Sequence, residues 1–243
     1  MRKLKNYLLR WTSMPNPNVT SYEHFTEEDR GHITVIPNTL YHHKTLQLKY
    51  TTYDMMEGQD KIYQRRYPGV MVLSDDLEHP YMYGRVLDLF HVNVRNDGPG
   101  SLLPSGDAPI VQMAWVRWFK LDGPSGFNLL RYPSVSFYES HEPDAFGFIH
   151  PDEIIRAVHL IPRFRSGKTR EYLDDPSRAR PDVEDQDWKH FGVNMYVYTP
   201  SHHTTHLHSV SFWGKTGGSR YVHAVLRGWH WPQVHAAGRT LVR

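Results

Sequence analysis

One long apolar stretch dominates the chain: residues 81–94 have the sequence YMYGRVLDLFHVNV. β-Branched and aromatic residues such as Val, Tyr and Phe favour the pleated, half-buried surface of a sheet. We therefore expect one long strand here, with a bend or a bulge at Gly84. A second run, IVQMAWVRWF at residues 110–119, has the same character and follows a loop rich in Gly and Pro. The two runs are predicted to lie side by side in one sheet.

Shorter β-rich runs surround this pair, whereas helical patterns are few. Further strands are expected at residues 34–36, 46–53, 69–74, 134–138 and 158–162. Residues 3–11 have the apolar spacing of a short amphipathic helix, Thr26 and Asp29 are placed as a capping box, and residues 150–157 indicate a helical turn. This order predicts a mainly β fold: a small curved β-barrel or strongly bent sheet, short flanking helices and an irregular C-terminal tail. The residues expected in its core are Val86, Leu87, Leu89, Val116, Phe119, Phe146, Ile155 and Leu160.

Composition limits the classes of function. The chain has 28 Lys and Arg against 26 Asp and Glu, a formal charge of +2, which is not the strongly basic balance of an obvious nucleic-acid binder. It has no Cys, which excludes disulfides and thiolate metal sites. No run approaches about 18 apolar residues, so no membrane span and no membrane partner are expected. We expect an intracellular protein.

Seven sequence blocks follow one another in an order that is specific as a set. They are LKNYLLRW at 4–11, FTEEDRGHI at 25–33, LKYTTYDMMEGQD at 48–60, HPYMYGRVLDLFHVNV at 79–94, MAWVRWF at 113–119, DAFGFIHPDEIIRAVHLIPRF at 144–164 and DWKHFGVNMYV at 187–197. The series resembles the C-terminal region of Plavaka-type proteins, of the Kyakuja–Dileera–Zisupton group of transposase-like proteins in basidiomycete fungi. The resemblance covers residues 1–197. Because the catalytic part of such proteins lies upstream, it implies a non-catalytic C-terminal module.

A second resemblance lies inside the first. The order of GRVLDLF, WVRWF and HPDEIIRAVHLIP is similar to that of bromo-adjacent homology domains, distorted β-barrels that bind partners in chromatin. It implies the fold, but no ligand, because the aromatic cage of that family has no counterpart here residue by residue. The resemblances imply DNA, chromatin or the upstream transposase part as partners, and a nuclear location. Three alternatives stay open: a binding module, an accessory fragment of a transposase catalytic assembly, and a decayed coding sequence without present function.

The chain divides into four segments by composition and resemblance. They are a helical and loop segment at residues 1–32, a β-barrel-like domain at 33–164, a polar linker with a final strand at 165–197, and an irregular tail at 198–243. After Val197 the chain departs from the related proteins. Back-translation from Gly217 onward, started at the second base of each codon, can restore their sequence DRDMFMRY followed by GGGIGH. We interpret the tail as a retained intron followed by a shifted frame; the alternative is a divergent tail.

A segment that was never selected for folding should make few contacts with the barrel. We therefore expect deletion of residues 198–243 to leave the melting temperature nearly unchanged. On this interpretation the histidine cluster of the tail, although imidazole is a good metal ligand, is accidental, and no metal site is expected. The cluster consists of His202, His203, His206 and His208.

Two groups of side chains could bind a ligand. The basic group, which could contact nucleic-acid phosphates, consists of Arg163, Arg165, Lys168 and Arg170. Its alternative is a solvated basic loop. The aromatic group is Trp115 and Trp118, whose faces could attract a cation. Their alternative is core packing, and because strand side chains alternate between faces, at least one of the two should lie outside the main core.

Other motifs do not form a catalytic or cofactor site. The sequence SGKT at 166–169 is similar to the end of a phosphate-binding loop, but that loop needs Gly where Pro162 stands. Acids cluster at Asp75-Asp76, Asp174-Asp175 and Glu184-Asp185-Asp187 in polar, turn-like stretches, where solvated loops are expected rather than a two-metal centre. We expect no catalytic residue, no cofactor and no metal.

Overall fold

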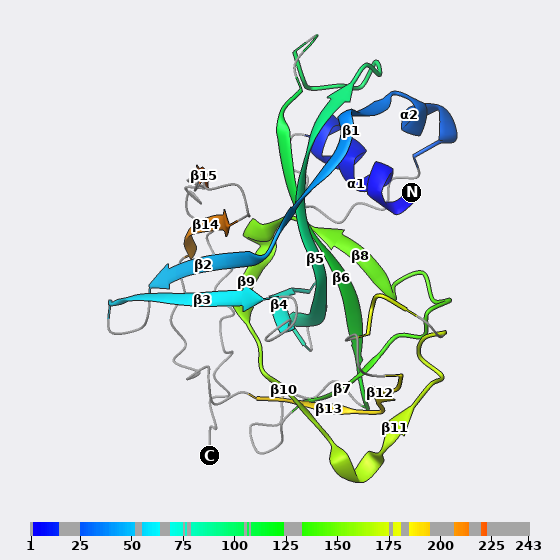
Figure 1. The fold of residues 1–243 in the computed structure, drawn as a ribbon, viewed down its shortest axis with the longest axis vertical. Helices are drawn as coiled ribbons and strands as arrows, with labels where there is room; N and C mark the ends of the chain where they lie inside the picture. Colours follow the sequence, from blue (N-terminus) through cyan, green and yellow to red (C-terminus); the bar gives the residue numbers. More distant parts are fainter. Residues whose placement is uncertain are drawn as a thin grey trace, which may run out of the picture.

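A computed structural model gives the fold (Figure 1). The residues that it describes are 2–14, 25–51, 55–63, 69–74, 76, 79–104, 106, 108–123, 133–174, 177–180, 185–194 and, as backbone only, 207–213 and 220–222. The helices are α1 (Arg2–Ser13), α2 (Glu27–Gly31) and the 3₁₀ turns η1 (Pro151–Glu153) and η2 (Phe164–Ser166). None of the described helices is long and apolar enough to cross a membrane.

Strands make up most of the described residues, so the predicted mainly β class is confirmed. They are β1 (Ile33–His43), β2 (Thr45–Thr51), β3 (Glu57–Tyr63), β4 (Gly69–Leu73), β5 (Tyr81–Asn96), β6 (Ile110–Leu121), β7 (Ser134–Phe137), β8 (Phe146–Ile149), β9 (Ile154–Ala157), β10 (Leu160–Pro162), β11 (Lys168–Thr169), β12 (Asp187–Trp188), β13 (Phe191–Val193), β14 (Leu207–Trp213) and β15 (Arg220–Val222). All the recorded pairings are antiparallel.

The predicted pair of long strands, β5 and β6, lies at the centre of the main sheet. The pairing runs from Tyr83 opposite Phe119 to Asn93 opposite Ile110. Its bulge lies between Val86 and Asp88, so the prediction of a bulge at Gly84 was wrong by a few residues. Gly84 serves close packing instead, because a Cβ there would lie 2.2 Å from Val116 Cγ1.

The main sheet curls strongly into a half-barrel (Figure 1). Its strand order is β10-β13-β7-β6-β5-β4-β9, with β1 also pairing with β5 and β8 with β6. A second sheet has the order β15-β14-β2-β3, and its β2–β3 hairpin projects from the body. Asp60 of β3 ties this hairpin to β9, since its carboxylate accepts hydrogen bonds from Arg156 Nε and from the backbone N–H of Ala157, both at 2.9 Å.

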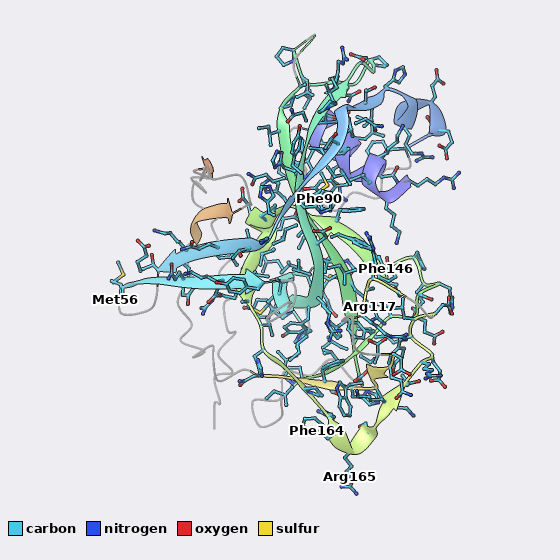
Figure 2. The ribbon with its side chains drawn as sticks, viewed as in Figure 1. Met56, Phe90, Arg117, Phe146, Phe164 and Arg165 are labelled. Carbon is cyan, nitrogen blue, oxygen red and sulfur yellow. The ribbon has the colours of Figure 1, made fainter. Side chains whose placement is uncertain are left out.

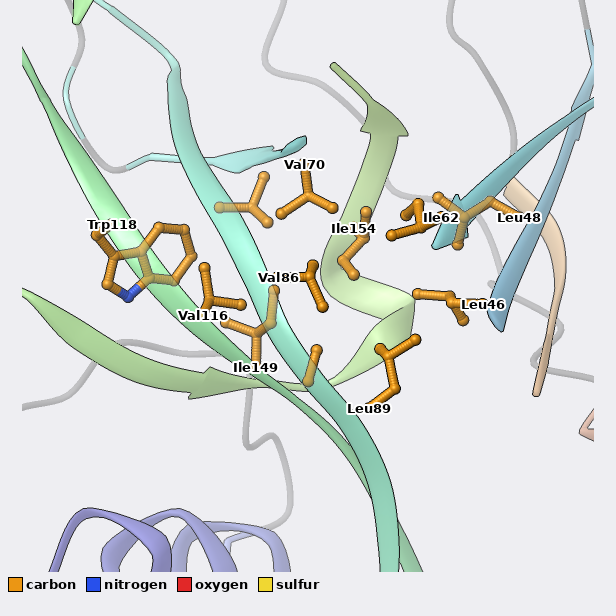
Figure 3. Packing of buried hydrophobic residues seen from close by; sticks show 12 residues of the cluster. Leu46, Leu48, Ile62, Val70, Val86, Leu89, Val116, Trp118, Ile149 and Ile154 are labelled. Atoms are coloured by element: carbon orange, nitrogen blue, oxygen red, sulfur yellow. The ribbon is translucent and has the colours of Figure 1, made fainter. Parts of the chain in front are cut away.

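Three apolar clusters fill the fold. The largest lies between the main sheet and the β2–β3 hairpin and contains Leu46, Leu48, Val86, Val116 and Trp118 (Figure 3). The second lies under α1, and the third packs phenylalanines of β6, β7 and β13 at the end of the sheet where β10 lies. Of the predicted core, four residues are buried, namely Val86, Leu89, Val116 and Phe119. The other four are partly buried, namely Leu87, Phe146, Ile155 and Leu160.

The short helices follow the sequence signals in part. α1 buries Leu8 and its apolar neighbours against the second cluster. α2 begins at the predicted capping box of Thr26 and Asp29. Residues 150–157 form only the 3₁₀ turn η1 before the chain continues as β9, so the helical turn is shorter than predicted.

One expectation about the C-terminal part needs correction. Residues 165–197 were predicted as a polar linker with a final strand, but the described residues of this segment contribute β11, β12 and β13, and β13 inserts between β7 and β10 of the main sheet. The tail was predicted to be irregular; its described backbone forms β14, which pairs along β2 from Leu207 to Trp213, and β15, which pairs with β14. A hairpin added to an existing sheet edge satisfies backbone groups on both sides. The rest of residues 198–243 lies outside the described residues.

Candidate nucleic-acid interface

A short turn between β10 and β11 carries most of the predicted basic group. The turn is η2, and we call residues 163–168, together with the Trp188 side chain, the η2 tip. Its backbone closes through hydrogen bonds from Ser166 N–H to Arg163 O at 2.9 Å and from Gly167 N–H to Phe164 O at 3.2 Å. Gly167 has φ of 74°, a conformation that suits glycine and lets the chain turn into β11.

Both ends of the η2 tip are anchored in paired strands. On one side β10 pairs with β13, and the backbone N–H of Arg163 donates to His190 O at 2.9 Å. On the other side β11 pairs with β12, with Lys168 opposite Trp188. The tip is therefore a turn held at two points, and its side chains project from a fixed base (Figure 2).

The side chains of the η2 tip combine exposed cations with aromatic rings. Arg163, Arg165 and Lys168 are all exposed. Phe164, which stands between the two arginines in the chain, is an apolar side chain and yet is 69% exposed. Its ring stands edge-on to Trp188, with centroids 5.1 Å apart and an interplanar angle of 89°. Lys168 Nζ lies 4.8 Å from the Trp188 ring centroid, within cation–π range.

Arg170, the fourth predicted cation, lies after the η2 tip and forms an ion pair. Its guanidinium forms an ion pair with Asp185, and both side chains are exposed. The hydrogen bond from Arg170 lowers the pKa of the Asp185 carboxyl below its usual range. The structure therefore brings Arg163, Arg165 and Lys168 together on the tip, and Asp185 lies near enough to both Arg170 and Lys168 for their charges to act on it.

A polar cluster supports the η2 tip from the sheet behind it. His190 Nδ1 lies 2.6 Å from Asp122 Oδ2. The same carboxylate accepts hydrogen bonds from Ser134 Oγ at 2.9 Å and Ser136 Oγ at 2.6 Å. A carboxylate that receives the Nδ1 proton fixes the orientation of an imidazole. Because Arg163 donates to the backbone of His190, this cluster fixes the strand on which the tip rests.

Asp187 was predicted to lie in a solvated loop, and this was wrong. It is buried, and its carboxylate accepts a bidentate hydrogen bond from Arg117, with both N–O distances at 3.0 Å. Arg180, also buried, donates from Nε to the same carboxylate at 3.2 Å. Arg117 lies in the interior (Figure 2), with its Cζ 3.7 Å from the Phe137 ring centroid. Burial lowers the pKa of Arg117, and Asp187 opposes that shift.

This buried network explains why residues 165–190 are not a linker. Arg117 belongs to β6, whereas Asp187 and Arg180 belong to the polar segment that follows the η2 tip. A buried carboxylate needs a close partner because desolvation of an isolated charge is costly. No sequence pattern marks this network, because its charged members come from positions far apart in the chain. The one visible indication of a buried charge was Arg117, a charged residue within the apolar run of β6.

The two tryptophans do not form one aromatic cage. Trp118 is buried in the largest cluster, beside Val116 (Figure 3). Trp115 packs on the opposite face, against the cluster under α1 and 6.1 Å from Phe146 between ring centroids. The alternation of strand side chains predicted this separation. Both rings serve packing in the structure.

The remaining candidates are placed as follows. Asp76, Asp174 and Asp185 are exposed, as expected for solvated loops. The other acids of those clusters, Asp75, Asp175 and Glu184, lie outside the described residues. So do the side chains of the tail histidines. Within the described part of the chain, no three His, Asp or Glu side chains are grouped so that they could hold a metal ion.

Burial shifts the pKa of two titratable groups away from the η2 tip, His43 and Glu153. His43 Nε2 lies 2.7 Å from His91 Nδ1, and burial lowers the pKa of His43 to about 4, with His91 adding to the effect. Burial also raises the pKa of Glu153, whose carboxylate caps η1 by accepting from the His150 N–H at 2.8 Å. These groups satisfy backbone or ring partners and lie among packed strands and helices.

No protein-family model, curated protein or solved structure that was compared with the chain matches it. The function is therefore argued from the chemistry of the site.

Proposed function

We propose that this chain is a non-catalytic module that binds nucleic acid through backbone phosphates at the η2 tip. The observation that carries the proposal is the exposure of Arg163, Arg165 and Lys168 on one short turn anchored at both ends. Because the turn is already ordered, binding does not have to order a flexible loop, and the entropy cost of that ordering is avoided. Preorganisation of this kind lowers the cost of binding.

The type of cation favours phosphate as the ligand. Arg163 and Arg165 have planar guanidinium groups, which match phosphate oxygens with two parallel hydrogen bonds. Lys168 adds a point charge beside them. The formal charge of the chain is only +2, so long-range attraction by the whole molecule is weak. Affinity must then come from this local group, and it must fall as salt rises.

The sequence resemblance supports DNA as the nucleic acid. The block DAFGFIHPDEIIRAVHLIPRF ends at Phe164, and the block DWKHFGVNMYV contains Trp188 and His190. The η2 tip and its support therefore lie inside the part of the chain that resembles Plavaka-type transposase-like proteins. We propose that the chain belongs to that group, and that its location is nuclear.

The test compares charge removal at the tip with the same removal elsewhere. The double variant Arg163→Ala/Arg165→Ala should weaken binding of fluorescein-labelled DNA by about tenfold or more at low salt, measured by fluorescence anisotropy. The matched control is Lys44→Ala/Lys61→Ala, which removes two exposed cations from the β1–β2 connection and β3. Equal affinities for the two double variants would overturn the proposal.

A further inference from the structure

We propose that the nucleic acid bound at the η2 tip is single-stranded, with one base stacked on the Phe164 ring. This inference rests on the proposed phosphate-binding function and names its substrate class. The observation behind it is the placement of Phe164 between two exposed arginines with 69% of its surface open.

The ring of Phe164 is oriented as an open platform. Its contact with Trp188 is perpendicular, at 89°, so the two rings share an edge-to-face contact rather than a stacked one. Trp188 itself has Lys168 over its ring. Trp188 therefore contacts Phe164 through one edge-to-face contact, and Phe164, labelled in Figure 2, is otherwise largely exposed.

A single strand suits this platform better than a duplex does. In a duplex the faces of the bases are stacked on one another, and only base edges are displayed in the grooves. Phe164 has no polar atom with which to recognise a base edge. Inserting the ring between stacked base pairs would cost a few kcal/mol per step. A single strand offers base faces without that cost, and base–aromatic stacking tolerates any sequence.

The flanking arginines fit the same substrate. Arg163 and Arg165 lie on either side of Phe164 in the chain, and both are exposed. A stacked nucleotide has a phosphate on each side of its sugar, so exposed cations at the two positions next to Phe164 in the chain can hold the strand while the base lies on the ring. An anionic membrane is the other surface that basic and apolar side chains can meet. One exposed phenyl ring between two arginines favours the nucleotide.

The experiment uses the full chain and three labelled probes of equal length. They are a single strand of about 15 nucleotides, its duplex, and an abasic strand with the same phosphates but no bases. We expect the single strand to bind about tenfold or more tightly than either of the other two at the same salt. Phe164→Ala should weaken single-strand binding about 5- to 100-fold, and it should leave abasic binding unchanged. Phe164→Trp should retain single-strand binding.

The control variant is Leu102→Ala, which truncates another exposed apolar side chain, at 58% exposure, far from the tip in sequence. It should bind all three probes as the wild type does. Circular dichroism of both Ala variants checks that the fold is intact, as expected for exposed positions.

The outcomes separate the inference from the proposed function. If duplex and single strand bind equally, and Phe164→Ala has no effect while Arg163→Ala/Arg165→Ala weakens binding, phosphate binding stands and the single-strand inference is overturned. If none of the three nucleic acids binds, both are overturned. Binding to phosphatidylserine vesicles that depends on Phe164, without binding to nucleic acid, would assign the tip to membranes instead.

Discussion

Asp187 holds the segment that follows the η2 tip against the main sheet. It is the acid between two buried guanidinium groups, Arg117 and Arg180. Buried ion pairs are not in themselves strong stabilisers, but removal of one partner leaves the others buried without compensation. Arg180 also donates to Leu173 O at 2.6 Å, so the network fixes the backbone as well as the charges. Asp187 thus couples β6 to Arg180 and, through it, to Leu173.

Substitution of Asp187 by Asn tests this coupling. We expect Asp187→Asn to lower the free energy of unfolding by about 3–5 kcal/mol, because two buried arginines would lose their counter-charge. Urea denaturation followed by circular dichroism measures it. The matched control, Asp185→Asn, removes an exposed acid two residues away and should leave the unfolding midpoint unchanged. Similar midpoints for the two variants would show that the buried network contributes nothing.

At the scale of elements, the sequence predicted the strands better than their details. The β5–β6 pair was predictable because long runs of Val, Tyr, Phe and Trp favour a pleated surface over a helix. The position of the bulge was not predictable, since it depends on the register of β5 against β6 rather than on glycine content. β13 was seen as a strand in a linker, because only three-dimensional pairing with β7 and β10 shows that it belongs to the sheet.

Gly84 gives a prediction at this scale. A Cβ at position 84 would lie 2.2 Å from Val116 Cγ1 and 3.0 Å from Trp118 ring atoms, so β5 could not keep its distance from β6. We expect Gly84→Ala to destabilise the protein by about 1–3 kcal/mol through overpacking. Gly100→Ala is the control, because nothing lies within 4 Å of its Cβ position. The same thermal midpoint for both variants would contradict the packing described here.

The site illustrates the same limit. Arg163, Arg165 and Lys168 were recognisable from sequence as a basic group, because they lie within a few residues of one another. The sequence did not reveal the contributions of Phe164, Trp188 and His190. Trp188 and His190 reach the tip only through the pairing of β11 with β12 and of β10 with β13. Sequence proximity revealed the charges, and strand pairing revealed the aromatic platform.

At the scale of the whole molecule, the tail was predicted to be irregular, and its described residues add the strands β14 and β15 to the fold. The part of it that the structure describes as β14 pairs along β2, from Leu207 to Trp213. β2 carries Leu46 and Leu48, both buried, and its edge would be exposed without β14. An uncovered edge strand is a template for pairing with other chains. Backbone pairing of this kind requires only an available strand edge. It therefore leaves no distinctive pattern of side chains in the sequence from which it could be predicted.

Truncation decides between the two accounts of the tail. Deletion of residues 198–243 should lower the melting temperature by several degrees, since a loss of about 1 kcal/mol shifts it by roughly 2–4 °C in a protein of this size. Deletion of residues 223–243 alone keeps β14 and β15 and is the control. Differential scanning calorimetry provides the measurement. Equal melting temperatures for the full chain and the longer deletion would support a retained intron and shifted frame.

The salt dependence of DNA binding tests phosphate recognition at the η2 tip most directly. The logarithm of the binding constant for a labelled single strand, plotted against the logarithm of salt concentration between about 50 and 200 mM, falls with a slope near −0.7 per phosphate contact. Arg163→Ala/Arg165→Ala should reduce the magnitude of that slope by roughly 1.4, because two contacts are lost. Lys44→Ala/Lys61→Ala should leave the wild-type slope. A slope for Arg163→Ala/Arg165→Ala that equals the wild-type slope would contradict the assignment of phosphate binding to this tip.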